Sequence, residues 1–162
     1  MDRLKVIANS SPLINLAKIE QLDLLHKLYK EITIPSAVHR EIVSEGYGKP
    51  GSLAIQSLCD KKQIIIREIH NKDLYHALET ELDLGEAEVI TLALEIKNDL
   101  ILLDETEARR VAASYKLPLT GFIGILIKAS SAGLIEDFKK TLDKAIALGF
   151  YINPRLYQRL LS

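Results

Sequence analysis

The sequence has very little of what several specialised kinds of protein require. Its 162 residues include one cysteine, Cys59, one methionine and no tryptophan. A single cysteine excludes an internal disulfide and fits a reducing compartment, where an unpaired thiol packs as a small hydrophobic group. Because no motif of a thiol nucleophile surrounds Cys59, we do not expect cysteine-based catalysis.

An excess of one charge and a long apolar run are also missing. Twenty-one lysines and arginines oppose 22 acidic residues, for a formal net charge of -1. No global basic field therefore attracts nucleic acid, and any such binding needs a local patch. The most membrane-like stretch, residues 122–127, ends at Lys128, well short of the roughly 20 residues that a span needs. The N-terminus lacks the apolar region of a signal peptide, so we expect a cytoplasmic protein without membrane association.

Several familiar motifs are absent as well. The glycine pair Gly121 and Gly124 is too small a signal for a dinucleotide site, and no phosphate-binding P-loop pattern occurs. Ser10 and Ser11 lack the flanking glycines of a nucleophile elbow, which argues against a serine hydrolase. None of the histidines has the paired spacing of a zinc site; they are His26, His39, His70 and His76.

The chain instead alternates short apolar runs with helical patterns. The predicted strands are residues 5–8, 31–34, 64–66, 100–103 and 118–121. The predicted helices are two short ones on either side of residues 21–23, with Ser11 as N-cap and Pro12 at the first helical position, and then 36–45, 52–58, 83–97, 105–115, 122–132, 136–148 and 154–161. Such alternation predicts an α/β fold with a parallel sheet covered on both faces, and 162 residues suit a single domain.

Polar residues recur where the chain passes from strand to helix. They are Asn9, Glu41, Glu86 and Asp104. In an open parallel sheet the carboxyl ends of the strands line the ligand crevice, so acids gathered there suggest a site for a hard cation. Asn9 stands where an aspartate would be expected, and an asparagine also suits a tight turn.

Glu86 has two interpretations. Helical spacing places it on the apolar, core-facing stripe, whereas Glu88, Thr91 and Glu95 fall on the side expected to face solvent. A carboxylate on a buried face suggests a functional site. The alternative is a capping box with Asp83, in which the Glu86 side chain bonds back to the N-cap backbone.

Asp104 and Glu41 are open to structural interpretations too. Asp104 ends an apolar strand, yet Asp104 and Glu107 also match a capping box for the next helix. Glu41 falls on the sheet-facing side of its helix, or it pairs with Lys49 or Arg40.

Several segments together resemble the PIN-domain nuclease superfamily, and more narrowly a prokaryotic branch of predicted nucleic-acid-binding proteins of unknown function. In chain order they are residues 9–14, residues 34–38 with Glu41, residues 84–88, residues 103–105 with Ala108 and Arg109, and the pair Thr120-Gly121. The resemblance covers about residues 4–135. It implies a three-layer α/β/α sandwich around a mainly parallel sheet of four or five strands. The domain would span residues 1–162, with a core at about 4–135 and a C-terminal helical extension at about 136–162.

The resemblance also implies an activity, which is hydrolysis of RNA phosphodiesters by an endoribonuclease that holds Mg²⁺ or Mn²⁺. Many relatives are toxins of toxin–antitoxin pairs, dimeric and silenced by a small protein. We accordingly expect RNA, a homodimer and a small antitoxin as partners.

Carried over position by position, the catalytic and metal-binding set is Asn9, Glu41, Glu86 and Asp104. Glu105 or Glu107 would substitute in the last position. Ser11 and Thr120 would orient water or phosphate. The RNA backbone would be held by Arg109, Arg110 or Lys128, although these charges also suit a solvated helix face.

Asn9 is the departure from the family pattern. Replacing an aspartate removes one negative charge, and affinity for a hard cation depends on ligand charge. The alternative function is therefore a catalytically impaired PIN-like module that binds RNA or a protein partner. A phosphotransfer receiver or a haloacid-dehalogenase-like phosphatase is disfavoured, because both need an aspartate nucleophile after the first strand.

Overall fold

A central parallel sheet organises the computed structural model, which describes residues 3–162. Within these residues the strands are β1 (Leu4–Ala8), β2 (Tyr29–Pro35), β3 (Ile65–Arg67), β4 (Leu100–Leu102) and β5 (Leu119–Thr120). Their order is β3-β2-β1-β4-β5, and every neighbouring pair is parallel. The predicted α/β/α sandwich is confirmed. The first two residues of the domain expected at 1–162 lie outside the described residues.

The strand order places a switch point at the carboxyl ends of β1 and β4. From β1 the chain moves outward to β2 and β3, and it then returns to the other side of β1 to form β4 and β5. Ala8 pairs with Leu102 across the two central strands, and the N–H of Asn9 donates to the Leu102 carbonyl at 2.9 Å. Residues that follow β1 and β4 therefore lie side by side, where open α/β sheets place their ligands.

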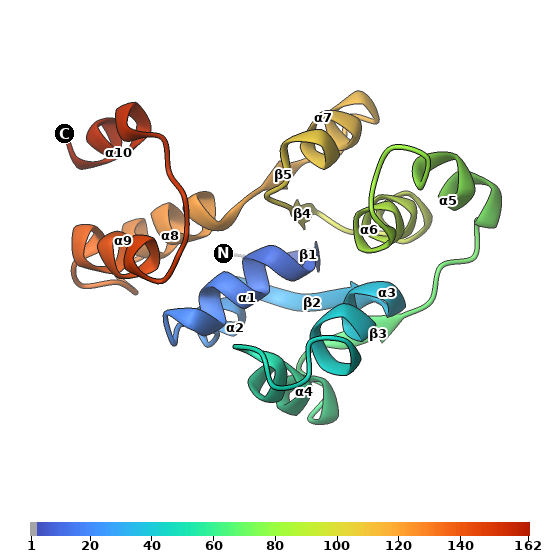
Figure 1. Ribbon diagram of the computed structural model, residues 1–162, viewed down its shortest axis with the longest axis horizontal. Helices are drawn as coiled ribbons and strands as arrows, with labels where there is room; N and C mark the ends of the chain where they lie inside the picture. Colours follow the sequence, from blue (N-terminus) through green and yellow to red (C-terminus); the bar gives the residue numbers. More distant parts are fainter. Residues whose placement is uncertain (1–2) are drawn as a thin grey trace.

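Helices cover both faces of the sheet (Figure 1). They are α1 (Ser10–Lys18), α2 (Leu24–Leu28), α3 (Ser36–His39), which continues into the π-helical turn η1 (Arg40–Ser44), α4 (Ser52–Asp60), α5 (Lys72–Leu78), α6 (Leu84–Glu95), α7 (Thr106–Ser114), α8 (Phe122–Ser131), α9 (Phe138–Ala147) and α10 (Pro154–Leu161). None of them is both long and apolar enough to cross a membrane, as far as residues 3–162 are concerned.

The boundaries differ from the prediction at three points. Helix α1 begins at Ser10 with Asn9 as its N-cap, so Ser11 and Pro12 lie inside the first turn. Strand β2 begins earlier than predicted and includes Pro35, which pairs with Arg67 at the end of the ladder. Helix α5 was not predicted, because it is short, buries only Leu78 and has little apolar periodicity to reveal it.

Helix α6 is buried along residues 85–93, which corrects the solvent-facing stripe that was predicted to include Glu88 and Thr91. Glu88 and Thr91 are 7% and 0% exposed. The helix packs against β1 and β2 and also against α3, α5 and α7, so that its exposed residues are confined to its ends. The carboxylate of Glu88 is compensated by the N–H of Ala37, which donates to its Oε1 at 3.0 Å in the first turn of α3.

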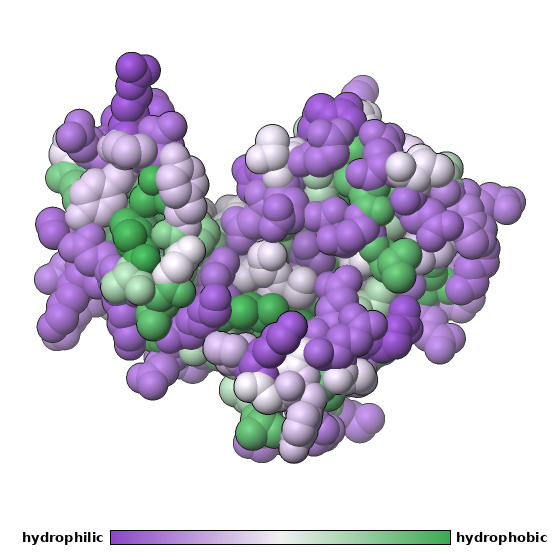
Figure 2. Space-filling model, viewed as in Figure 1, coloured by the Kyte–Doolittle hydropathy of each residue, from purple (hydrophilic) through white to green (hydrophobic). Residues whose placement is uncertain are grey.

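The last two helices form a projection from the sheet layers. Leu142 and Ala145 of α9 are buried, whereas α10 has no buried residue. The hydroxyl of Tyr157 on α10 donates to Asp143 on α9 at 2.6 Å. Figure 2 shows open space between this projection and the part of the surface that contains α7.

Truncating Glu88 is expected to destabilise the fold. Glu88→Ala leaves the buried N–H of Ala37 without an acceptor, which should lower the free energy of unfolding by about 1–3 kcal/mol. Glu88→Gln keeps an acceptor and should lose less. Urea unfolding measures both, with Glu45→Ala on an exposed site as the control. Equal effects of Glu88→Ala and Glu45→Ala would contradict the assignment.

Candidate functional site

Asn9 occupies the centre of the candidate site. It follows β1 directly and is 3% exposed. Its backbone adopts an extended N-cap conformation, but its side chain does not cap α1. Within residues 3–162, its buried Oδ1 has no hydrogen-bond partner. A buried amide oxygen without a donor is costly, so this atom is well suited to accept from a bound group.

Asp104 lies beside Asn9, two residues after β4. Its Oδ1 accepts from the N–H of Phe122 at 2.9 Å, at the start of α8, while its buried Oδ2 has no partner among the described residues. Burial raises the pKa of this carboxyl, which the Phe122 N–H and the nearby Arg109 charge oppose. The capping role predicted for Asp104 is wrong, because the N-cap of α7 is Glu105.

Glu41 reaches the site from η1. Ser10 donates to its Oε2 at 3.0 Å, and the backbone of Gly85 also stabilises the charged form. A Cβ on Gly85 would lie 2.8 Å from the same oxygen, so this carboxylate requires glycine at the start of α6. Burial is the main cause that raises the pKa of Glu41, and the negative charge of Asp83 adds to it. Among residues 3–162, Glu41 forms no ion pair with Lys49 or Arg40.

Glu86 combines a structural and an electrostatic role. The capping box with Asp83 is present: the Glu86 N–H donates to Asp83 at 2.8 Å, and the Asp83 N–H donates to Glu86 at 3.1 Å. The Glu86 side chain is nevertheless close enough to Glu105 and Glu41 for their charges to act on it. Burial raises the pKa of Glu86 most, and the negative charges of Asp83, Glu105 and Glu41 add to it, whereas the hydrogen bond from the Asp83 backbone opposes them.

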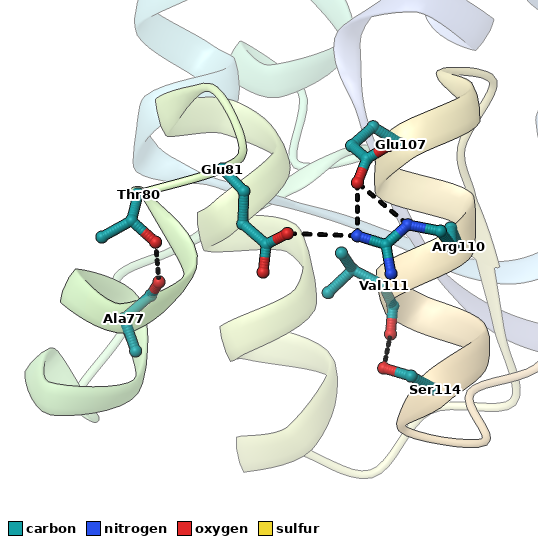
Figure 3. A network of polar contacts seen from close by, with 7 residues as sticks. All are labelled: Ala77, Thr80, Glu81, Glu107, Arg110, Val111 and Ser114. Atoms are coloured by element: carbon teal, nitrogen blue, oxygen red, sulfur yellow. Dashed lines mark hydrogen bonds and ion pairs between the residues drawn. The ribbon is translucent and has the colours of Figure 1, made fainter.

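Ser11 and Glu105 lie near Asn9, whereas Glu107 points to a different part of the surface. Ser11 donates to Glu105 at 3.3 Å, so both residues lie on the Asn9 side of the site. Glu107 instead binds Arg110 (Figure 3). Glu105 is therefore the better placed of the two predicted substitutes for Asp104.

Only one of the three predicted cationic residues lies with these groups. Arg109 donates to the Leu103 carbonyl at 2.8 Å and lines a hollow with Asp104, Thr120 and Gly121.

The other two cations are engaged elsewhere. Arg110 pairs with Glu107 and with Glu81, at 3.1 Å from the latter, and so joins α7 to the segment before α6 (Figure 3). Lys128 lies 4.9 Å from the ring centroid of Tyr29. Tyr29 begins β2, so this contact is at the amino ends of the strands, opposite to the carboxyl ends where Asn9 and Asp104 lie. The RNA-holding role predicted for Arg110 and Lys128 stays a prediction, and neither residue lies in the hollow that contains Arg109.

The donor chemistry of the site fits a hard cation. Asn9 and Asp104 each present one buried oxygen without a partner among the described residues, and three nearby carboxyl groups have raised pKa values that a cation would relieve. Oxygen ligands of this kind suit Mg²⁺ or Mn²⁺. In residues 3–162, however, no three His, Cys, Asp or Glu side chains are already grouped closely enough to hold a metal ion. Glu41 and Glu86 are held by the backbone at the N-terminus of α6 instead.

Two participants were not predicted from the sequence. Ser10 positions Glu41, although of the two adjacent serines only Ser11 was singled out. Gly85 provides the space for the same carboxylate. The signal for both was local: a serine at the start of the helix that follows the first strand, and a glycine in the first turn of a largely buried helix.

Comparison with known proteins adds one finding. A protein-family model described as a PIN domain matches residues 5–162, so the match includes α9 and α10 as well as the sheet. A comparison with curated proteins found no match.

The raised pKa of Asp104 predicts a pH-dependent effect on stability. Above its ordinary value of 3.8, the folded protein retains a proton that the unfolded chain has lost, so ionising this buried group costs stability as pH rises. Asp104→Asn removes that cost, and its stability relative to wild type should increase as the pH rises above 3.8, the ordinary pKa of the group. Urea unfolding in EDTA measures this difference.

Glu107→Gln is the control of opposite sign. Arg110 lowers the pKa of Glu107, so this variant should lose stability relative to wild type as pH rises. The same trend in both variants would contradict the assignment for Asp104.

Proposed function

The chain belongs to the PIN-domain family, which has a nuclease-type fold, and from this premise we propose that it is a metal-dependent endoribonuclease. The observation that carries the proposal is the pair of buried oxygens on Asn9 and Asp104, without partners in residues 3–162, at the switch point of the sheet. Glu41, from η1, and Glu86, from the first turn of α6, lie near the same strand ends. Such a group of oxygen atoms suits a divalent cation, which would in turn bind the phosphate of a phosphodiester.

The proposed metal ligands are Asn9, Glu41, Glu86 and Asp104, with Glu105 as the substitute for one of them. A bound Mg²⁺ or Mn²⁺ would lower the pKa of a water molecule and offset the charge that develops on the phosphate.

The other residues would position reactants. Ser10 orients the Glu41 carboxylate through its hydroxyl. Ser11 and Thr120 would direct a water or a phosphate oxygen, and Arg109 would bind a phosphate at the Asp104 side. Arg110 and Lys128 do not belong to this set because their positive groups are already engaged.

The finer biological role is a proposal that rests on the family. A toxin-like function, a small antitoxin as partner, a homodimer and a cytoplasmic location are the roles common among such relatives.

A second candidate function is an RNA- or protein-binding module without catalysis. Asn9 favours it, because an amide in place of a carboxylate weakens the attraction for a divalent cation. The absence of a ready group of three carboxylates in residues 3–162 points the same way.

The nuclease proposal predicts that Glu86→Gln and Asp104→Asn cleave RNA much more slowly than wild type. Each variant removes one negative charge from the proposed metal ligands, so the cation that would stabilise the transition state is held more weakly, and the rate should fall about 100-fold or more. Glutamine still suits the capping box, so Glu86→Gln should fold normally. The assay uses mixed-sequence RNA with Mn²⁺, and Glu45→Gln is the control. Undiminished cleavage by both variants would overturn the site assignment.

The role of Asn9 is tested by adding the missing charge. Asn9→Asp should bind Mn²⁺ several-fold more tightly than wild type, because hard-cation affinity grows with ligand charge. Isothermal titration calorimetry measures the two affinities. Measurable binding with this order supports the metal site, whereas no binding by either protein would favour the non-catalytic module.

A further inference from the structure

A second hollow opens beside Glu41, away from the hollow that contains Arg109. It is bounded by α1, η1 and residues 46–51, here called the glycine loop, which joins η1 to α4 (Figure 1). Its lining residues are Ile14, Lys18, Glu41, Ile42, Gly46, Lys49 and Pro50. The hollow therefore combines two lysines and an apolar wall with one of the candidate metal ligands.

The glycine loop is fixed at both ends. A Cβ on Gly46 would lie 2.5 Å from the carbonyl oxygen of Ile42, so the chain leaves η1 in close contact with it. Gly51 has a φ of +88°, and a Cβ there would lie 2.8 Å from the Cβ of Ala17 on α1. Between these contacts Tyr47 extends outward with 77% of its surface exposed. An aromatic side chain is thus presented on an anchored loop next to the hollow.

The lysines of the hollow have no competing acidic partners in the described part of the chain. Within residues 3–162 neither Lys18 nor Lys49 forms an ion pair, whereas Lys27 and Lys139 pair with aspartates at 2.9 and 2.7 Å. The Glu41 carboxylate is held by Ser10 and by the Gly85 backbone. The ammonium groups of Lys18 and Lys49 are therefore available to bind an anion that extends from the candidate metal ligands into this hollow.

We propose that this hollow binds the single-stranded RNA next to the bond that is cut, with Lys18 and Lys49 on backbone phosphates and Tyr47 stacked on a base. This inference rests on the proposed function. Positive charge that follows the backbone, combined with an exposed aromatic ring, is the usual means of binding single strands. A base must be unpaired to stack on Tyr47, so the arrangement favours single-stranded over duplex RNA.

The first test is binding of a fluorescently labelled, mixed-sequence single-stranded RNA to the full chain in EDTA. Fluorescence anisotropy at several salt concentrations gives the affinity and its salt dependence. The double variant Lys18→Ala/Lys49→Ala should lower the salt slope by about 1.4, that is, about 0.7 for each phosphate that a lysine no longer neutralises. Tyr47→Ala should weaken binding about tenfold, and Tyr47→Phe should restore it, because the phenyl ring still stacks.

Matched controls exist elsewhere on the chain. Lys97→Ala removes an exposed lysine that precedes β4 and so lies toward the amino ends of the strands. Tyr151→Ala removes a tyrosine that is 80% exposed and lies between α9 and α10. Both controls should bind RNA as wild type does.

The second test is steady-state cleavage with Mn²⁺. Removing groups that hold substrate and transition state equally raises KM and leaves kcat unchanged, which is the expected result for Tyr47→Ala and for the double lysine variant. A fall in kcat alone would contradict the positioning role.

The two proposals fail in different ways. If wild type cleaves RNA and the Tyr47 and lysine variants behave like Lys97→Ala and Tyr151→Ala, the RNA-binding role of the hollow is wrong and the nuclease proposal stands. If wild type does not cleave RNA but binds it in a way that depends on Tyr47 and the two lysines, the nuclease proposal is wrong and the RNA-binding role of the hollow is supported. Duplex RNA bound as tightly as single strands, or no RNA binding at low salt, overturns the inference.

Discussion

The reciprocal capping of two helices by buried carboxylates is the interaction on which the site depends. Glu88 of α6 accepts from the N–H of Ala37 at the start of α3, and Glu41, which follows α3, lies against Gly85 at the start of α6. Backbone N–H groups at a helix N-terminus have no intrahelical partner and attract negative charge. Each helix therefore supplies a carboxylate to the N-terminus of the other, while α6 also has its own capping box of Asp83 and Glu86.

This capping concentrates negative charge where little water can screen it. The pKa values of Glu41, Glu86 and Asp104 are all raised, and burial is the largest cause in each. Ionising these buried acids therefore costs stability, and a bound cation would reduce that cost. Asn9 reduces that repulsion because its amide is neutral, and the same substitution reduces the attraction for Mg²⁺ or Mn²⁺.

The sequence predicted the positions of the strand-end residues but not their partners. Short apolar runs revealed the strands, and parallel topology then required Asn9 and Asp104 to lie close together. Periodicity failed for Glu88, because it assumes that one helix face meets water, whereas α6 is enclosed. Nor does periodicity reveal that Arg110 contacts Glu81 and that Lys128 contacts Tyr29, because these partners are distant in the sequence and are set by tertiary packing.

The net charge of -1 is compatible with RNA binding once the location of the cations is considered. Acidic groups at the strand ends would repel a polyanion in the absence of metal. The chain does not surround them with a broad basic surface but places a few cations nearby. Arg109 lies in one hollow beside Asp104, and Lys18 and Lys49 lie in another beside Glu41. Positive charge thus adjoins the acids in two separate places, where it can hold phosphates on either side of a central one. In this arrangement the position of a few cations, rather than their total number, determines where an RNA strand would lie.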